Sequence, residues 1–213
     1  MLHDVLWRLN LRLAQSCLAH PFVRALGDGT LPAELFRSFI AQDAFFLRAF
    51  LKAYALGLAR SETETMTSFY ELMGGCLEEL KVHRAFAAEA GIDLRSVVPN
   101  VACRAYTDFL LRTAWHTSLG ETVAAMTPCM RLYAYLGEEL VPKCSQRHPY
   151  RRWIQAYGGE EFQRLAERLE ALLDRVGTDT SEVRESYGYP SDDLQAALHR
   201  QSPKSDAGRE RQA

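Results

Sequence analysis

The chain is organised around the segment Thr117–Leu140, TSLGETVAAMTPCMRLYAYLGEEL. At helical spacing its apolar side chains fall on one face, which predicts a buried helix face made of Ala125, Met126, Cys129, Leu132, Tyr133 and Leu136. Pro128 lies in the middle of this helix, and an interior proline removes a main-chain hydrogen bond and usually kinks the helix. A thiol should therefore point inward beside a kink. A purely structural buried cysteine is the alternative, because free cysteine is among the most buried residue types.

The remainder of the chain is also predicted to be helical. The sequence from Ser61 to Glu64 has the S-x-x-E spacing of a capping box and should begin a helix that ends at Gly91. Further helices are predicted over residues 5–18, 32–59, 100–115, 150–156 and 160–175. No alternating pattern is long enough to build a sheet, so we predict an all-α fold, a compact bundle of about seven helices.

Length and charge restrict the class of protein. The chain has 213 residues, enough for one sizeable core, and we predict a single helical domain over residues 1–187. In residues 188–213, Gly188 and Pro190 interrupt the helical pattern, and this tail is predicted to be disordered. The formal net charge of −2 gives no reason to expect nucleic acid or an anionic membrane as a partner.

The cysteines indicate a reducing compartment. There are five of them, widely spaced and without a C-x-x-C pair: Cys17, Cys76, Cys103, Cys129 and Cys144. This pattern argues against a disulfide framework and against a zinc knuckle. The amino-terminal sequence lacks the apolar core of a signal peptide, and no apolar run approaches the ~18 residues of a membrane span. We therefore expect a cytoplasmic protein with neither a metal nor another cofactor.

Asp43 lies at the centre of an aromatic helix face. The aromatic side chains on this face, at −7, −4, +3 and +7 from the acid, are Phe36, Phe39, Phe46 and Phe50. A lone carboxylate in apolar surroundings is costly unless it has a partner. Asp43 could cap a neighbouring helix or pair with Arg48 or Arg131. The functional interpretation is that aromatic walls with one fixed acceptor bind a flat heteroaromatic ligand that carries an amino group.

Glu79 and His83 are four residues apart on one predicted helix, a spacing that can ligate a metal. No second carboxylate–histidine pair occurs elsewhere to complete such a site, and a solvated helix face is the favoured interpretation. A helical metal oxidase that uses Glu79 and His83 stays open as a less favoured hypothesis. Tyr106 and Tyr157 are further aromatic candidates, although core tyrosines are common.

Together these residues resemble a known family. The sequences TPCMRLYAYLG at 127–137 and HPYRRWIQAYGG at 148–159 resemble the TenA/THI-4 proteins, specifically the cysteine-bearing thiaminase II (aminopyrimidine aminohydrolase) branch. The sequences AHPFVRAL, RSFIAQDAFFLRAF and AYTDFLL are similar to the same family, so the resemblance covers roughly Leu6 to Arg175. It implies a haem-oxygenase-like helical fold without haem, assembled as a homotetramer.

The resemblance also implies roles for individual residues. The nucleophile falls on Cys129, and the acid that hydrogen-bonds the aminopyrimidine falls on Asp43. The aromatic shell falls on Phe46, Tyr106 and Tyr133, with Phe46 where relatives commonly have tyrosine. Tyr157 is the tyrosine near the thiol, with a part in catalysis and in binding. The implied activity is hydrolysis of aminopyrimidines, which are thiamin breakdown products, to hydroxymethylpyrimidine in thiamin salvage.

The resemblance fails at the carboxyl terminus. The family has an inward glutamate in a final helix, followed by large aromatics; its position here falls on His199, and no such pattern is near it. Glu182 and Glu185 lie upstream and should occupy the outer part of the segment. We therefore expect a site that lacks one carboxylate, an exposed apolar face on the first helices and impaired hydrolysis. The alternative is a non-catalytic aminopyrimidine-binding or regulatory protein with the same pocket.

Overall fold

The computed structural model describes residues 1–188, and this part of the chain contains helices and no strand. The prediction of an all-α fold is therefore confirmed. The helices are α1 (Leu2–Leu18), α2 (Pro21–Asp28), α3 (Ala33–Ala59), α4 (Thr63–Glu89), α5 (Val101–His116), α6 (Leu119–Leu140), the short 3₁₀-helix η1 (Val141–Lys143), α7 (Arg151–Gly158) and α8 (Glu160–Val176). Residues 181–188 are also helical.

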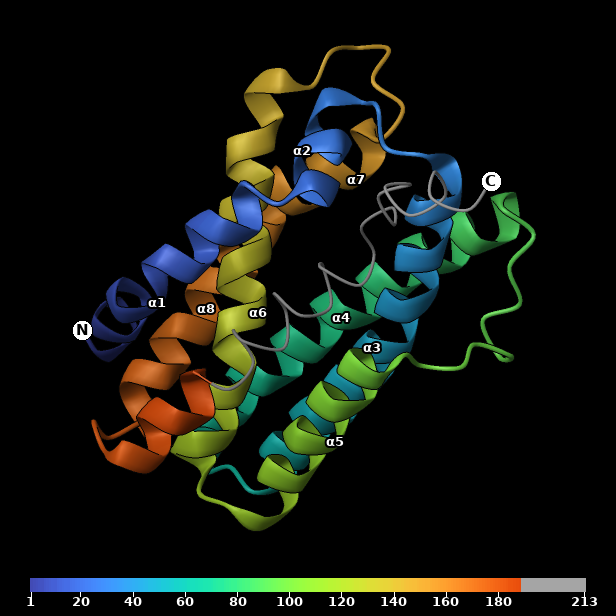
Figure 1. Ribbon diagram of the computed structural model, residues 1–213. Helices are drawn as coiled ribbons and strands as arrows, with labels where there is room; N and C mark the ends of the chain where they lie inside the picture. Colours follow the sequence, from blue (N-terminus) through green and yellow to red (C-terminus); the bar gives the residue numbers. More distant parts are fainter. Residues whose placement is uncertain (189–213) are drawn as a thin grey trace, which may run out of the picture.

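The central position belongs to α6. Figure 1 shows this helix running between α1 and α8 on one side and α3, α4 and α5 on the other. Ser118 and Glu121 form a capping box at its start, which satisfies main-chain donors that the first turn leaves free. Pro128 lies inside α6, and the helix continues on both sides of it. Because α6 is buried on most of its faces, residues of this helix are held in the middle of the molecule.

Two glycines set the distance between α6 and α7. A Cβ atom on Gly137 would clash with the main chain of Tyr157 and Gly158, and a Cβ atom on Gly158 would clash with Gly137. Only hydrogen side chains permit such a close crossing of two backbones. The crossing brings the end of α7, and with it Tyr157, against the core side of α6.

The capping box predicted between Ser61 and Glu64 is wrong. The N-cap residue of α4 is Glu62, and its side chain makes no capping hydrogen bond. Instead the hydroxyl of Thr65 donates to the carbonyl oxygen of Glu62 at 3.0 Å. The helix ends close to the predicted position, with Gly91 at a φ of +67° beyond the last turn, a conformation that favours glycine.

The segment 181–188 covers part of the first helix, which corrects the expectation that nothing would do so. Val183 and Tyr187 are buried, and Tyr187 lies in a small groove with Trp7, Cys17 and Leu132. The predicted disordered tail and the position of His199 lie outside the described residues, apart from Gly188, which ends the described helical segment. Glu182 and Glu185 are exposed, as predicted.

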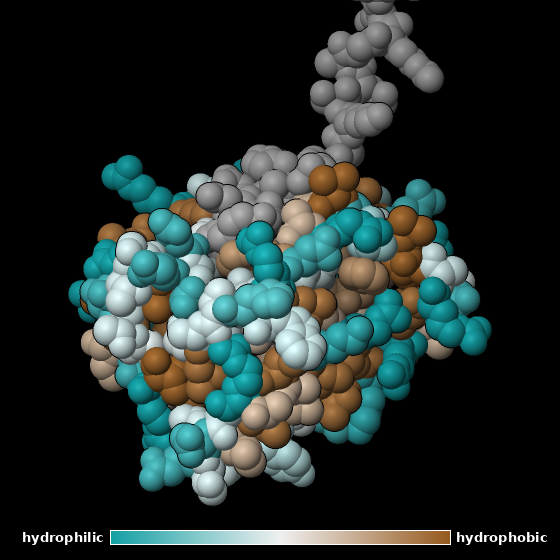
Figure 2. Space-filling model, turned by 90° about the horizontal axis from the view of Figure 1, so that it is seen from below, coloured by the Kyte–Doolittle hydropathy of each residue, from teal (hydrophilic) through white to brown (hydrophobic). Residues whose placement is uncertain are grey.

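Among residues 1–188, no helix combines the length and the hydropathy that a membrane crossing requires. Figure 2 shows that apolar side chains on one face of the molecule form separate patches with polar side chains between them.

Candidate active site

Asp43 is buried in the middle of α3 and does not pair with either arginine that the sequence offered. Its Oδ2 lies 2.8 Å from Nε2 of His83, and its Oδ1 accepts a hydrogen bond from the Tyr133 hydroxyl at 3.3 Å. The Tyr157 hydroxyl lies 3.4 Å from Oδ2. Three elements, α4, α6 and α7, therefore converge on this carboxylate. A buried charge with several partners avoids the cost of an isolated one.

The two arginines are engaged elsewhere. Arg48 donates to the carbonyl oxygen of Leu94 at 3.2 Å. Arg131 lies 3.5 Å from Glu170 and stacks over the ring of Trp7. The alternative in which Asp43 is a structural acid paired with one of these arginines is therefore wrong.

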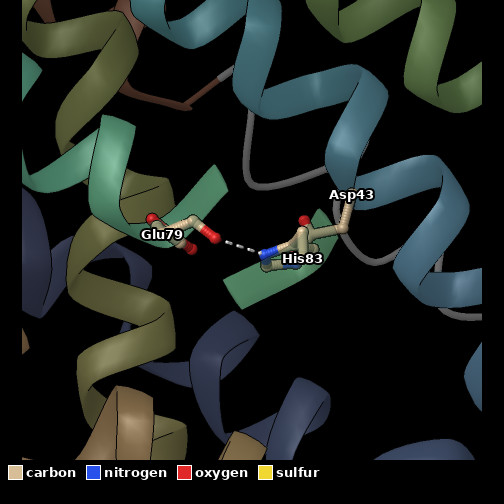
Figure 3. A group of neighbouring side chains, drawn as sticks. All are labelled: Asp43, Glu79 and His83. Carbon is tan, nitrogen blue, oxygen red and sulfur yellow. Dashed lines mark hydrogen bonds and ion pairs between the residues drawn. The ribbon is translucent and has the colours of Figure 1, made fainter. Parts of the chain in front are cut away.

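His83 is buried and faces two acceptors, which contradicts its interpretation as part of a solvated helix face. Nδ1 lies 3.0 Å from the main-chain oxygen of Glu79, and Nε2 lies against the carboxylate of Asp43 (Figure 3). With an acceptor at each nitrogen, the ring satisfies both only when both nitrogens carry hydrogen. Burial alone would lower the pKa of His83, but the hydrogen bond and charge of Asp43 outweigh it and raise that pKa to about 9. His83 and Asp43 form a buried ion pair.

Glu79 is the second carboxylate of the site. It lies half-buried on α4, one turn before His83, and the Tyr157 hydroxyl donates to its Oε1 at 2.5 Å. Burial and the nearby charge of Asp43 raise the pKa of Glu79 to about 7, while His83 and Tyr157 act in the opposite direction. Glu79 therefore changes its protonation state near neutral pH.

Cys129 faces the same cluster from α6, and its side chain is buried. Burial, reinforced by the negative charges of Asp43 and Glu79, raises the pKa of its thiol well above the ordinary value. Without help, this thiol is neutral at physiological pH. Any nucleophilic role for it requires a group that accepts its proton.

Two neighbouring cavities meet at this cluster. A small one of about 10 Å³, room for about one water, is lined by Asp43, Phe46, Leu47, Phe50, Glu79, Cys129, Met130, Tyr133, Tyr157 and Phe162. A larger one of about 360 Å³ lies between α4, α7 and α8 and is lined by Glu79, His83, Trp153 and Tyr157, among others. Glu79, Tyr157 and Phe162 line both cavities, so they form the wall between them.

The structure brings together most of the site residues that the sequence suggested. Asp43, Phe46, Cys129, Tyr133 and Tyr157 all line the small cavity. Tyr106 stands one layer behind it: its ring centroid lies 5.0 Å from that of Phe46, and its hydroxyl donates to the carbonyl oxygen of Ala125 at 3.2 Å.

Of the four phenylalanines around Asp43, only two belong to the cavity. Phe50 lines it with Phe46. Phe36 and Phe39 pack away from it, Phe36 against Phe86 and Tyr150 and Phe39 against Phe22 and Trp153. The two phenylalanines that follow Asp43 in sequence therefore line the cavity, whereas the two that precede it pack in the hydrophobic core.

Sequence reasoning underestimated Glu79 and His83. Their spacing of four residues was the signal in the sequence. From the sequence, only a second carboxylate–histidine pair was considered to complete the site. In the structure the third residue is instead Asp43, a single carboxylate on α3. One ligand atom from each of the three residues lies within 4.8 Å of the others, close enough to surround a metal ion. Since the hydrogen bonds to Asp43 and to the Glu79 carbonyl engage both nitrogens of His83, we interpret the group as a proton-holding network.

The protein is thus a helical bundle in which a thiol and two carboxylates line a small aromatic cavity, with the His83 imidazolium paired to one of the carboxylates. The sequence model of the TENA/THI-4/PQQC family matches residues 10–187, and the chain belongs to this family. The resemblance stated from the sequence motifs is thereby confirmed.

Individual relatives agree with this assignment. The chain is 36% identical to an aminopyrimidine aminohydrolase of Halalkalibacterium halodurans, over 73% of this chain and 72% of that protein. It is 32% identical to the aminopyrimidine aminohydrolase of Bacillus subtilis, over 80% and 75% of the two chains. The solved structure of a TenA homologue from P. horikoshii superposes with a TM-score of 0.87 at 27% identity, covering 94% of this chain and 98% of that one. The expected haem-oxygenase-like helical fold is confirmed.

Proposed function

We propose that this chain hydrolyses an aminopyrimidine to the corresponding hydroxymethylpyrimidine, as in thiamin salvage. One observation carries the proposal: Asp43 on α3 and Cys129 on α6 line the same buried aromatic cavity. The relatives named aminopyrimidine aminohydrolases support the choice of substrate class.

Asp43 is suited to orient the pyrimidine. Its carboxylate is held in place by His83 and Tyr133 and can accept hydrogen bonds from the exocyclic amino group of the substrate. The rings of Phe46 and Tyr133 supply apolar surface for the heteroaromatic ring. Since Phe46 has no hydroxyl, this side of the pocket contributes stacking alone.

Cys129 is the proposed nucleophile. Its sulfur adds to an electron-poor carbon of the ring, which allows the group on the 5-methylene to leave; water then adds to the methylene and the sulfur is expelled. Such covalent catalysis divides a difficult substitution into two easier steps. The step most in need of assistance is the first, because the buried thiol holds its proton strongly.

Substrate binding requires the wall between the two cavities to move. The small cavity holds about one water and cannot contain a pyrimidine ring, whereas the volume of about 360 Å³ next to it is within the usual size of a ligand pocket. Shifts of Tyr157 and Phe162 would join the two spaces. The substrate would then enter between α4, α7 and α8 and reach Cys129 from that side.

The direct test is incubation of the purified chain with 4-amino-5-aminomethyl-2-methylpyrimidine, with ammonia and hydroxymethylpyrimidine measured together. We expect both products in equal amounts. Tight binding measured by calorimetry without any product would instead identify a non-catalytic aminopyrimidine-binding protein.

We also propose that the chain assembles as a homotetramer. Several large apolar side chains of α4 are exposed, including Met66, Tyr70 and Leu77, which lie on one side of the helix. Light scattering on the eluting protein gives the mass, and four times the chain mass of 24.1 kDa is the expected result.

A further inference from the structure

We propose that Glu79 is the proton-transfer residue of this site, the group that removes the proton of Cys129 and delivers it to the leaving amine. The inference rests on the proposed hydrolysis and adds a catalytic residue to it. It assigns to a residue of α4 the proton-transfer role for which the sequence pattern around His199 offers no glutamate.

The position of Glu79 is the first argument. It lines the small cavity with Cys129, and it also lines the outer cavity of about 360 Å³. A proton shuttle must reach the reacting atoms and must also exchange protons with water between turnovers. As a side chain in the wall between the two spaces, Glu79 meets both requirements.

The second argument is that no other described acid is available. Among the residues that line the cavity of Cys129, the carboxylic acids are Asp43 and Glu79. Asp43 is paired with the imidazolium of His83 and is assigned to the substrate amino group, so it is a poor proton carrier. Glu182 and Glu185 in the segment 181–188 are exposed and lie outside the lining of this cavity.

Tyr157 is the positioning residue for this carboxylate. Its hydroxyl donates to Oε1 of Glu79 at 2.5 Å, and the close crossing of Gly137 and Gly158 holds Tyr157 against α6. The second oxygen of Glu79 is left to receive a proton. Tyr157 thereby orients the shuttle.

The proton path balances over one turnover. As the bond between the Cys129 sulfur and the ring carbon forms, the S–H proton passes to the Glu79 carboxylate. As the methylene carbon–nitrogen bond breaks, the same proton passes to the amine, which leaves as ammonia. Water then forms a bond to the methylene carbon and gives one proton to Glu79. The carbon–sulfur bond finally breaks, and Glu79 returns that proton to the sulfur. The sum is aminomethylpyrimidine plus water to hydroxymethylpyrimidine plus ammonia.

The ionisation of Glu79 agrees with this role. Because the pKa of Glu79 is about 7, its carboxyl group can both accept and release a proton readily at neutral pH. The titratable groups that interact with it are Asp43 and Tyr54 from α3, Cys76 and His83 from α4, Cys129 and Tyr133 from α6, and Tyr157 from α7. From α8 the neutral ring of Phe162 lines the same cavity, and Glu161 lies in the outer one together with Glu78 and Lys81.

The test compares Glu79→Gln with Glu64→Gln, an exposed acid of the same helix that lines neither cavity. We expect Glu79→Gln to lower kcat by about 10²- to 10⁴-fold, the usual contribution of a general acid–base group. Affinity for hydroxymethylpyrimidine by calorimetry should stay within about threefold of the parent, which shows that the pocket is intact. Glu64→Gln should retain parental kcat.

Chemical rescue separates a proton-transfer role from a structural one. Sodium formate should raise the activity of Glu79→Ala at least about tenfold, because a small carboxylate can enter through the outer cavity. It should not change the activity of Glu64→Ala. In the parent, kcat should rise with pH around the pKa of Glu79, which is about 7. Tyr157→Phe should shift this rise to higher pH, because the hydrogen bond from Tyr157 lowers the pKa of Glu79 by favouring the ionised carboxylate.

Each outcome decides one point. A Glu79→Gln protein with more than about a third of parental kcat overturns the role of Glu79 and leaves the proposed hydrolysis intact. A slow Glu79→Ala protein that formate does not rescue also overturns it. A parent protein that forms no hydroxymethylpyrimidine overturns the proposed function, and the role of Glu79 with it.

Discussion

Nε2 of His83 lies 2.8 Å from Oδ2 of Asp43, across a separation of 40 residues in sequence and between two helices that pack side by side. Both partners are buried, with exposed fractions of 1% for the imidazole and 7% for the carboxylate. The imidazolium of His83 is the counter-charge of the Asp43 carboxylate, which lines the aromatic cavity. Loss of His83 should therefore affect both the free energy of unfolding and the ability of Asp43 to bind substrate.

The pH dependence of stability should reveal this pair. The pKa values of His83 and Glu79, about 9 and about 7, are both higher than those of the same groups in an unfolded chain. The folded protein therefore holds more protons than the unfolded one, and stability falls as pH rises. The stabilisation from Glu79 is lost between about pH 4.5 and 7, and that from His83 between about pH 6.5 and 9. Urea unfolding across pH 5–9.5 measures the decline.

His83→Gln should flatten the part of this curve between about pH 6.5 and 9. It should also lower stability at pH 6, because it leaves the Asp43 charge buried without a counter-charge. His116→Gln is the matched control, since that side chain is exposed at the end of α5. A His83→Gln protein that keeps the parental slope in this range would show that the ring is neutral when folded.

Asp43→Asn should weaken aminopyrimidine binding. The substitution replaces an acceptor with an amide that partly donates toward the amino group of the substrate, and the expected loss is about 2–3 kcal/mol. Calorimetric titration with hydroxymethylpyrimidine measures it. Asp108→Asn on the exposed side of α5 is the control. Unchanged affinity in Asp43→Asn would remove this residue from the binding site.

Tyr187→Ala should destabilise the fold by about 3–5 kcal/mol, as is usual for loss of a buried aromatic side chain. Its ring is 1% exposed and lies against Trp7 and Cys17 of α1 and Leu132 of α6. Trp115→Ala, at a site that is 65% exposed, should change stability by less than about 0.5 kcal/mol. Equal denaturation midpoints for the two variants would mean that residues 181–188 contribute nothing to the bundle.

The sequence could predict the helices and the inward side of α6 because both are local properties. Periodic apolar side chains between Ala125 and Leu136 report which face of a helix is buried, whichever helix packs on it. The bounds of α5 and α8 were predicted to within one or two residues for the same reason. The predicted capping box at Ser61 failed because such short patterns compete with other satisfactory arrangements of a helix start, here a Thr65 hydroxyl bond.

The partners of Asp43 could not be predicted, because they depend on how α3 crosses α4. From the sequence, a neighbouring helix end, Arg48 or Arg131 was named as the partner of Asp43, and His83 was considered only together with Glu79. Glu79 and His83 were interpreted as part of a solvated helix face because the sequence offers no second carboxylate–histidine pair to complete a site with them. In the fold α4 packs against both α3 and α8, so even its polar side chains can face the interior.

Covalent catalysis by Cys129 is tested by measuring hydrolysis by the parent and by Cys129→Ala side by side. We expect hydroxymethylpyrimidine and ammonia from the parent, no measurable turnover by Cys129→Ala, and aminopyrimidine binding by both. Cys76→Ala, which alters another buried thiol on α4, should retain activity. Near-parental turnover by Cys129→Ala would contradict covalent catalysis by this residue, and absence of product from the parent would contradict the proposed hydrolysis altogether.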